Sequence, residues 1–218
     1  MTPTPAPAVP ARKSFRESQF EIREAAILDA THRLLARHGY DTLAMDDIAS
    51  EVGIAKGSLY RHFESKDALV GAVMVRLLRR TRECLEQQPA TDSARARLEA
   101  LLRWTLDERL AGGIPHLPAT SQALRDSLMS FPAYLDELLN LSESIGDLIR
   151  RAKDEGDLNP ELDDAFILYA FYARACDPTL DFLRAGGAMS DARIVDQMVL
   201  ACFSGLQAGA LRSPGETS

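Results

Sequence analysis

Apolar side chains recur at helical spacing along almost the whole chain. Near the N-terminus, Ile27, Ala30, Leu34 and His38 keep helical spacing, which predicts a first helix over 20–38 that Gly39 ends. No alternating pattern of strand length is found in the sequence. Similar helical patterns cover 66–85, 94–110, 119–126, 132–155, 165–182 and 191–211. The sequence therefore predicts an all-α protein.

Two short helices joined by a glycine are predicted before the helix at 66–85. Apolar residues at i, i+3, i+4 and i+7 form the first, and Gly53, which tolerates the left-handed conformation of a turn, follows directly. A second buried pattern then begins. These apolar positions are Met45, Ile48, Ala49 and Val52 in the first helix and Ile54, Leu59 and Phe63 in the second. Such a layout is a helix-turn-helix.

The second of these helices is rich in hydrogen-bond donors. Lysine, serine, tyrosine, arginine and histidine occur between Lys56 and Phe63 without a carboxylate, as a surface facing phosphates and base edges requires. Gly57 forfeits up to about 1 kcal/mol of helix propensity, a loss that makes sense where a backbone must approach another molecule closely. The alternative is a corner inside a helical protein, with Lys56, Arg61 and Lys66 as a solvated face.

Over roughly residues 22–75, the sequence resembles the head of the TetR family of one-component bacterial transcriptional regulators. The resemblance rests on Gly39-Tyr40, Asp47-Ile48-Ala49, Gly53-Ile54, Lys56-Gly57, Leu59-Tyr60, His62-Phe63 and Ser65-Lys66. It implies a three-helix DNA-binding head whose second short helix lies in the major groove, followed by a helical body that binds an effector and dimerises.

The resemblance also implies roles for individual residues. Tyr60, His62 and Lys66 are expected to grip the phosphate backbone, while Lys56, Gly57, Ser58 and Arg61 read bases. The expected DNA-binding set is Thr42, Met45, Lys56, Gly57, Ser58, Tyr60, Arg61, His62 and Lys66. The sequence departs from the family at Ala44 and Ala55, where the family often has serine or threonine. Thr42 or Ser58 is the candidate to take over part of the missing capping or phosphate contact.

Four parts of the chain are predicted. They are a flexible arm over 1–18, a DNA-binding domain over 19–80, an effector-binding and dimerisation domain over 81–212, and a flexible tail over 213–218. The arm has four prolines in its first ten residues and is basic at Arg12, Lys13 and Arg16. It is either a solvated tail or an arm that enters the minor groove.

The last predicted helix is apolar on two faces. One stripe is small and the other bulky, so the helix must be buried on two sides. We expect the small stripe to contact 165–182 of a second copy in a homodimer and the bulky stripe to face the core of its own chain. The alternative is a helix wholly inside one body. The small stripe is Ala201, Cys202, Gly205, Ala208 and Gly209, and the bulky stripe is Val195, Val199, Phe203 and Leu206.

The charge of the chain is unevenly distributed. The formal net charge of −7 over 218 residues would ordinarily argue against a nucleic-acid partner, yet residues 1–80 have 12 Lys and Arg against 10 Asp and Glu. Only charges within a Debye length of about 8–10 Å affect a bound duplex strongly. The slightly basic head is therefore compatible with binding double-stranded DNA.

Neither a catalytic nor a metal-binding pattern is found. Cys84, Cys176 and Cys202 lack a CxxC pair, which predicts buried small residues with a thiol sensor as the alternative. The four histidines lack metal-ligand spacing, and the carboxylate pairs Asp46-Asp47 and Asp163-Asp164 are interpreted as charges at helix N-termini. We expect no metal, no cofactor and no enzymatic activity.

The longest apolar run, 165–173, has nine residues, whereas a membrane span needs about 20. The proline-rich N-terminus also lacks the apolar core of a signal peptide. We therefore expect a cytoplasmic protein without a membrane partner.

The TetR resemblance implies control by a small, apolar effector that enters the body and separates the two heads. We expect a homodimeric repressor of a palindromic operator, the alternatives being a DNA-binding regulator without an effector or a helical enzyme. The candidate pocket residues are Trp104, Leu124, Leu128, Phe131, Tyr134, Phe166, Tyr169, Tyr172 and Arg174, with Arg125 and His116 as further polar anchors and ordinary core packing as the alternative for the aromatic residues.

Overall fold

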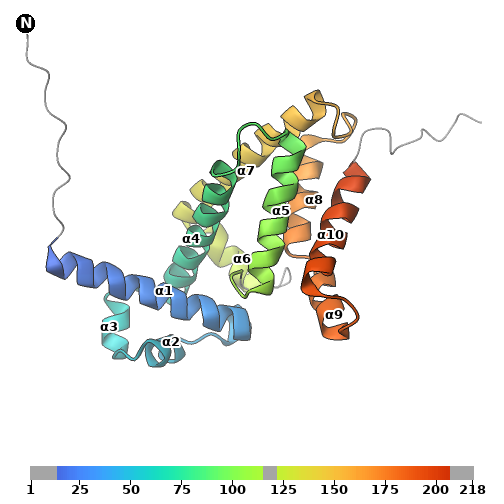
Figure 1. The fold of residues 1–218 in the computed structure, drawn as a ribbon. Helices are drawn as coiled ribbons and strands as arrows, with labels where there is room; N and C mark the ends of the chain where they lie inside the picture. The colour runs from blue at the N-terminus through green and yellow to red at the C-terminus, as the bar shows by residue number, and fades with distance from the viewer. Residues whose placement is uncertain (1–13, 115–121, 207–218) are drawn as a thin grey trace, which may run out of the picture.

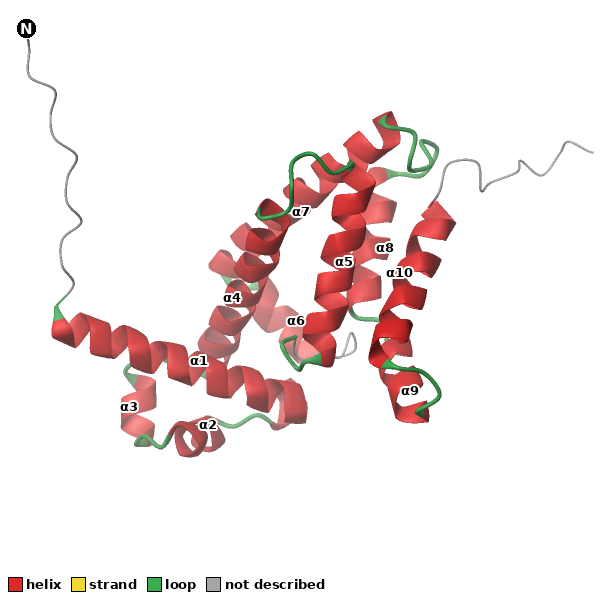
Figure 2. Cartoon of the chain, viewed as in Figure 1, coloured by secondary structure: helices red, strands yellow, loops and turns green. Residues whose placement is uncertain are grey.

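The computed structural model describes residues 14–114 and 122–206, which form helices and no strand (Figures 1 and 2). The predicted all-α fold is thereby confirmed. No helix in these two ranges is long and apolar enough to cross a membrane. The helices are α1 (Phe15–Thr42), α2 (Met45–Val52), α3 (Lys56–Tyr60), α4 (Lys66–Glu86), α5 (Ala94–Leu110), α6 (Gln122–Met129), α7 (Pro132–Asp154), α8 (Asp164–Ala175), α9 (Thr179–Gly186) and α10 (Asp191–Leu206).

Buried side chains gather in two hydrophobic clusters. The head cluster joins α1, α2 and α3 to the first half of α4, and the body cluster joins the second half of α4 to α5, α7, α8 and α10. In Figure 1, α2 and α3 lie on the side of α1 that faces away from the body. Leu69, Val70 and Met74 of α4 belong to the head cluster, whereas Leu78 and Leu85 belong to the body cluster.

Helix α6 packs with the head although it follows the body helix α5 in the chain. Leu124 and Leu128 are buried in the head cluster, and Tyr134 at the start of α7 contacts both clusters. The ring of Phe131 lies so close to Gly71 of α4 that a Cβ atom there would come within 2.8 Å of it. The segment that precedes α7 therefore packs between the head and the body.

Polar contacts also tie α4 to its neighbours. Arg76 pairs with Asp29 of α1 at 2.8 Å, and Glu137 of α7 lies between Arg79 at 2.6 Å and Arg82 at 3.7 Å. Nε2 of His32 in α1 donates to the carbonyl of Gly112 beyond α5, at 3.2 Å. The head is thus joined to the body by directed contacts as well as by shared apolar packing.

Most helix boundaries agree with the sequence pattern, but two predictions are wrong. The helix expected over 165–182 is split into α8 and α9, because Pro178 has no N–H with which to continue α8 and the Asp177 carboxylate accepts from the backbone of Thr179. Residues 15–18 of the expected arm are helical, because Ser14 and Glu17 form a capping box. The remainder of the arm, residues 1–13, and the tail at 213–218 lie outside the described residues.

Two glycines set the turns of the head. Gly53 ends α2 in the left-handed conformation, with φ 72° and ψ 35°. Gly39 has φ 75° and ψ 174°, which interrupts the last turns of α1 in a region that is essentially restricted to glycine. An added Cβ would meet no atom within 4 Å at either position, so the backbone conformation alone requires glycine there.

We predict that Gly39→Ala and Gly53→Ala each lower the free energy of unfolding by about 1–2 kcal/mol, because both place a Cβ in a disfavoured conformation. Asparagine tolerates the left-handed region, so Gly53→Asn should recover part of the loss while Gly39→Asn should not. Urea denaturation followed by circular dichroism measures all four variants. Equal recovery at both positions would contradict this assignment.

Candidate nucleic-acid interface

The short helices α2 and α3 lie on either side of the glycine turn, and buried apolar side chains hold α3 against the head. Ile48, Ala49 and Leu59 are buried between them and α1, and the amide of Ile54 donates to the carbonyl of Ala49 at 3.0 Å. Helix α3 has five residues and ends at Tyr60, so Arg61 and His62 follow it in a turn. Neither Ala44 nor Ala55 makes a side-chain cap. The helix therefore depends on tertiary packing rather than on its own caps.

The predicted base readers lie together on the outer surface of α3. Lys56, Gly57 and Arg61 are exposed and Ser58 is half-buried. The ammonium of Lys56 pairs with Asp46 at 2.7 Å, and the guanidinium of Arg61 donates to the Ser58 hydroxyl at 3.2 Å. Because exposed pairs of this kind contribute about 0–1 kcal/mol, both cations can exchange these partners for a nucleic acid at little cost.

Lys66 is held by the end of α1. Its ammonium donates to the carbonyl of Tyr40 at 3.1 Å and lies 4.3 Å from the centroid of the Tyr40 ring, while the Tyr40 hydroxyl donates to the Asp67 carboxylate. Burial, together with the hydrogen bond to Asp67, raises the pKa of Tyr40. The Gly39-Tyr40 and Ser65-Lys66 motifs thus also stabilise the fold, because their contacts join the end of α1 to the start of α4.

His62 has a fixed orientation on the same face. Its ring stacks on Phe20 of α1, with the ring centroids 4.0 Å apart. Nδ1 of His62 is buried and finds no hydrogen-bond partner within residues 14–114 and 122–206. Burial, helped by the nearby Arg23 and Arg61 and opposed by Glu24, lowers the pKa of His62. The imidazole is therefore predominantly neutral near pH 7.

Two residues of the expected DNA-binding set have other contacts. Met45 is only 9% exposed and belongs to the head cluster, so its side chain is part of the core. Because Met45 begins α2, a phosphate could contact only its backbone. Thr42 is exposed, but its hydroxyl donates to the carbonyl of His38 at 2.6 Å. Neither hydroxyl caps α2 or α3, so the capping part of the prediction for Thr42 or Ser58 is wrong. A phosphate contact by either hydroxyl stays a prediction.

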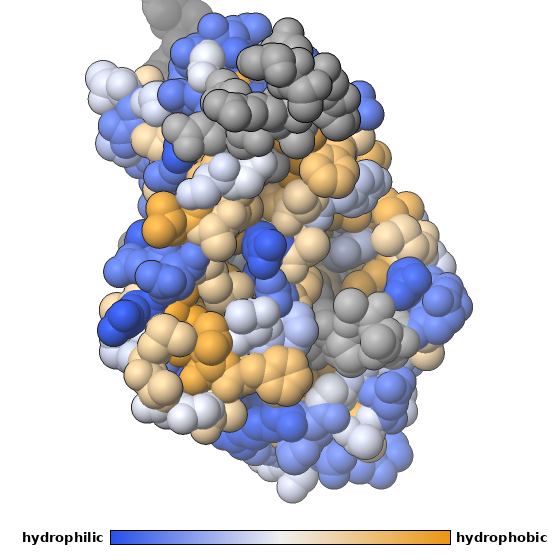
Figure 3. All heavy atoms as spheres, turned by 90° about the vertical axis from the view of Figure 1, so that its right-hand side faces the viewer, coloured by the Kyte–Doolittle hydropathy of each residue, from blue (hydrophilic) through white to orange (hydrophobic). Residues whose placement is uncertain are grey.

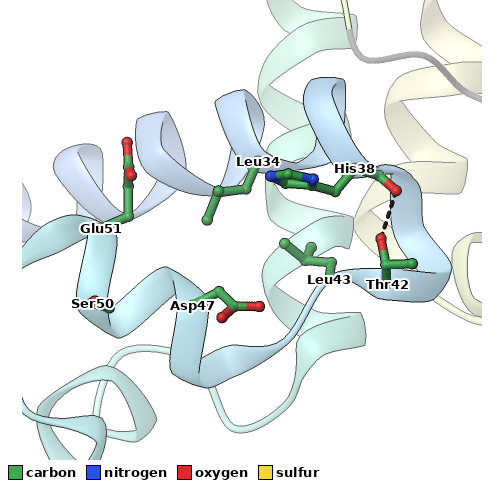
Figure 4. A pocket seen from close by; sticks show the side chains of 7 residues that line it. All are labelled: Leu34, His38, Thr42, Leu43, Asp47, Ser50 and Glu51. Carbon is green, nitrogen blue, oxygen red and sulfur yellow. Dashed lines mark hydrogen bonds between the residues drawn. The ribbon is translucent and has the colours of Figure 1, made fainter.

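A cleft of about 550 Å³ lies between α1 and α2 (Figure 4). Leu34 and Leu43 form its apolar part, and Asp47 and Glu51 give it a negative charge. Glu51 is already paired with Arg33 at 3.3 Å. Over the described residues, no group of three histidine, cysteine or acidic side chains could hold a metal ion. The cleft is therefore unsuited to phosphates, which leaves α3 and its flanks as the candidate nucleic-acid surface.

Comparisons with known proteins match this geometry. Residues 27–73 match the model of the bacterial regulatory proteins of the tetR family. An uncharacterized HTH-type transcriptional regulator of Mycobacterium tuberculosis is 42% identical over 59 residues, which cover 27% of this chain and 25% of that protein. The match thus spans about a quarter of that relative's length. The HTH-type transcriptional regulator UidR of Escherichia coli is 25% identical over 159 residues, 68% of this chain and 76% of UidR.

The head of this chain thus belongs with the tetR family of bacterial regulatory proteins, whose model it matches over residues 27–73.

Solved structures share the fold across head and body. The fatty acid degradation regulator FadR from Bacillus halodurans has a TM-score of 0.67 at 20% identity, with 93% of this chain and 99% of FadR covered. AibR, solved with isovaleryl coenzyme A and operator DNA, has a TM-score of 0.61 at 20% identity, with 83% and 98% covered. These likenesses show that the chain shares its fold with solved transcription regulators.

The TetR-like body separates the residues that the sequence assigned to one pocket. Tyr134, Tyr172 and Trp104 are half-buried beside the body cluster, and the Tyr172 hydroxyl lies 2.9 Å from that of Ser142. Burial raises the pKa of both tyrosines. Arg174 is half-buried and pairs with Asp177 at 2.6 Å.

Other residues of that set do not line the body's interior. Leu124 and Leu128 pack in the head cluster and Phe131 packs on Gly71. Phe166 and Tyr169 are 58% and 71% exposed, so they lie on the surface of this chain, and their part in an effector site stays a prediction. Spacing alone could not distinguish these cases, because core, surface and pocket aromatics share the same helical period. Arg125 is exposed, and His116 lies outside the described residues.

Gly57 differs from the other two glycines of the head, because the fold itself does not require glycine at this position. Its φ is not positive, and an added Cβ would meet no atom within 4 Å. Nothing within the described chain therefore requires glycine at this position, in contrast to Gly39 and Gly53.

We predict that Gly57→Ala leaves the free energy of unfolding unchanged or raises it by up to about 1 kcal/mol, since alanine is the better helix former. The same change should weaken DNA binding at least about tenfold if the backbone of α3 must approach the duplex closely. Denaturation and fluorescence anisotropy measure the two effects. Unimpaired DNA binding by this variant would remove Gly57 from the interface.

Proposed function

We propose that this protein is a transcriptional repressor that binds a palindromic operator as a homodimer and is released by a small, apolar effector. The observation that carries the proposal is the surface of α3. It combines exposed donors with Gly57, a glycine that the fold does not require, in a head that matches the TetR-family model. The proposed roles of Tyr60, His62 and Lys66 on phosphates and of Lys56, Gly57, Ser58 and Arg61 on bases rest on this placement.

The geometry of the head supports a division between these two groups. Arg61 is exposed, and its one hydrogen bond to a described residue is with Ser58, so its side chain can reorient toward base edges, whereas Lys66 is held on Tyr40. Tyr60 is exposed at the end of α3 and offers a neutral hydroxyl. A neutral donor to phosphate adds affinity for every sequence without releasing a counterion.

Apolar residues left exposed on the body support the homodimer. Ala165, Phe166, Tyr169 and Ala173 form one face of α8, and Leu200, Ala201 and Gly205 lie on the outside of the adjacent α10. Figure 3 shows apolar patches on the side of the molecule that α10 occupies. Val195, Val199 and Phe203 are buried in the body cluster, as expected of the bulky stripe.

The small stripe of α10 needs one correction. Cys202 is buried in the body cluster rather than available to a partner, and Ala208 and Gly209 lie outside the described residues. The proposed dimer face therefore rests on α8 together with Leu200, Ala201 and Gly205. Two copies that pair such faces across a two-fold axis would present two α3 helices to successive turns of one duplex face.

The packing of Phe131 and Tyr134 between head and body supports control by an effector. Tyr134 contacts both clusters, and Phe131 presses on Gly71 of α4, so a ligand that displaces the start of α7 in the body would also shift α4. A ligand changes DNA affinity only by binding one arrangement of the heads better than the other. Isovaleryl coenzyme A, which the AibR complex contains, belongs in a first screen beside simpler apolar compounds. A regulator without an effector remains the second candidate.

Selection from random duplex DNA tests the DNA-binding proposal. We expect the bound fragments to share a palindrome with half-sites about one helical turn apart or a multiple of it. Arg61→Ala should change the selected consensus, because it removes a base contact. Tyr60→Phe should keep the consensus and lower the affinity for all fragments with an unchanged salt dependence. Failure of the wild-type protein to enrich any sequence at low salt would overturn the proposal.

Charge substitution on the exposed body face tests the homodimer. We predict that Tyr169→Arg combined with Leu200→Arg raises the dimer dissociation constant at least about tenfold, because two unpaired cations would be buried at each contact. Sedimentation equilibrium measures this change. Leu139→Arg, a substitution of an equally exposed leucine on α7, serves as the matched control and should leave the mass unchanged. A monomeric wild type at micromolar concentration would contradict the proposed assembly.

A further inference from the structure

The first turns of α1 contribute nothing to the hydrophobic core. The buried residues of this helix begin at Ile27, although the helix begins at Phe15 behind the Ser14 cap. A helical extension of this length is marginal in water unless it packs on something. Phe20 provides such a contact, because its ring stacks on the imidazole of His62 immediately after α3.

The stack restricts the chemistry of His62. Its Nδ1 is buried and has no hydrogen-bond partner among the described residues, and a buried N–H without an acceptor is destabilising. The ring therefore places its proton on Nε2 when neutral. Protonation of the ring would force an N–H onto the buried Nδ1. The structure thus favours a neutral imidazole with one available donor, Nε2–H.

We infer that Phe20 is a positioning residue for DNA binding, whose ring holds the neutral His62 imidazole so that Nε2–H donates to a backbone phosphate. This inference rests on the proposed function, since it assumes that the α3 surface meets a duplex. It assigns to α1 a role at the interface that operates through His62. A pre-oriented donor loses less conformational entropy on binding than a free side chain.

Three charged groups lie close enough to affect the charge state of His62. Glu24, one turn beyond Phe20, favours the protonated form, while Arg23 of α1 and Arg61 of the α3 turn disfavour it. Removing the Phe20 ring would expose the imidazole and weaken the largest contribution, which is burial. The pKa of His62 should then rise toward 6.5, its ordinary value.

The test begins with NMR titration of His62 in the free, full-length protein. We expect Phe20→Ala to raise the pKa of His62 and to remove the preference for the Nε2–H tautomer. Phe20→Tyr, which keeps an aromatic ring, should retain both wild-type properties. Phe15→Ala is the matched control, because Phe15 is 79% exposed on the same helix and should leave His62 unchanged. An unchanged His62 pKa in Phe20→Ala would overturn the inference without any use of DNA.

DNA affinity supplies the second readout. At pH 7.5, Phe20→Ala should weaken binding of the selected operator about three- to tenfold with an unchanged salt slope, since a neutral donor releases no counterion. In a His62→Ala background, the same substitution should have no further effect, because Phe20 operates through His62. A full additional loss in that background would instead assign Phe20 a direct DNA contact and overturn its positioning role.

The two proposals fail in distinguishable ways. If the wild-type protein binds no duplex, the proposed function fails, whereas the NMR titration still reports whether Phe20 fixes His62. If the wild type binds its operator and Phe20→Ala binds it equally well, the positioning role fails and the regulator assignment stands. Thermal denaturation of Phe20→Ala shows whether the head remains folded in both measurements.

Discussion

Helix α4 packs into both hydrophobic cores of the chain, and the relation of head to body depends on this shared packing. Its first half supplies Leu69, Val70 and Met74 to the head, and its second half supplies Leu78 and Leu85 to the body. Because an α-helix is stiff over this length, a displacement at one end reaches the other as a rigid movement. The ion pairs of Arg79 and Arg82 with Glu137 fix α4 on α7 within this arrangement.

The segment before α7 contacts both the head and the body, so a displacement of this segment would reach α4. Helix α6 buries Leu124 and Leu128 in the head cluster, while α7, which follows directly, is a central helix of the body. Phe131, between α6 and α7, packs directly on Gly71 of α4, so this connection also contacts the helix that both cores share. Under the proposed function, this packing would couple a ligand in the body to the position of the head without a separate hinge domain.

The candidate nucleic-acid surface is held by contacts between residues that are distant in the chain. Tyr40 fixes Lys66, and Phe20 fixes His62, so α1 orients residues on both flanks of α3. Helix α3 itself has five residues and no side-chain cap, and it is stable only because Leu59 is anchored in the head cluster. Because so short a helix spans few base pairs, the proposed homodimer would read a longer sequence than one copy alone.

The sequence alone determined the elements whose signals are local. Periodic apolar residues gave the helices at 94–110 and 45–52, glycine gave the turn at Gly53, and the combined motifs gave the TetR-like head. Only the tertiary structure decided which aromatic residues are core, surface or contact. Phe166, Tyr134 and Phe131 have the same apolar character in the sequence, yet they lie on the surface, between two cores and against a glycine. The physical reason is that helical spacing specifies a face of a helix, whereas the partner of that face depends on residues distant in the chain.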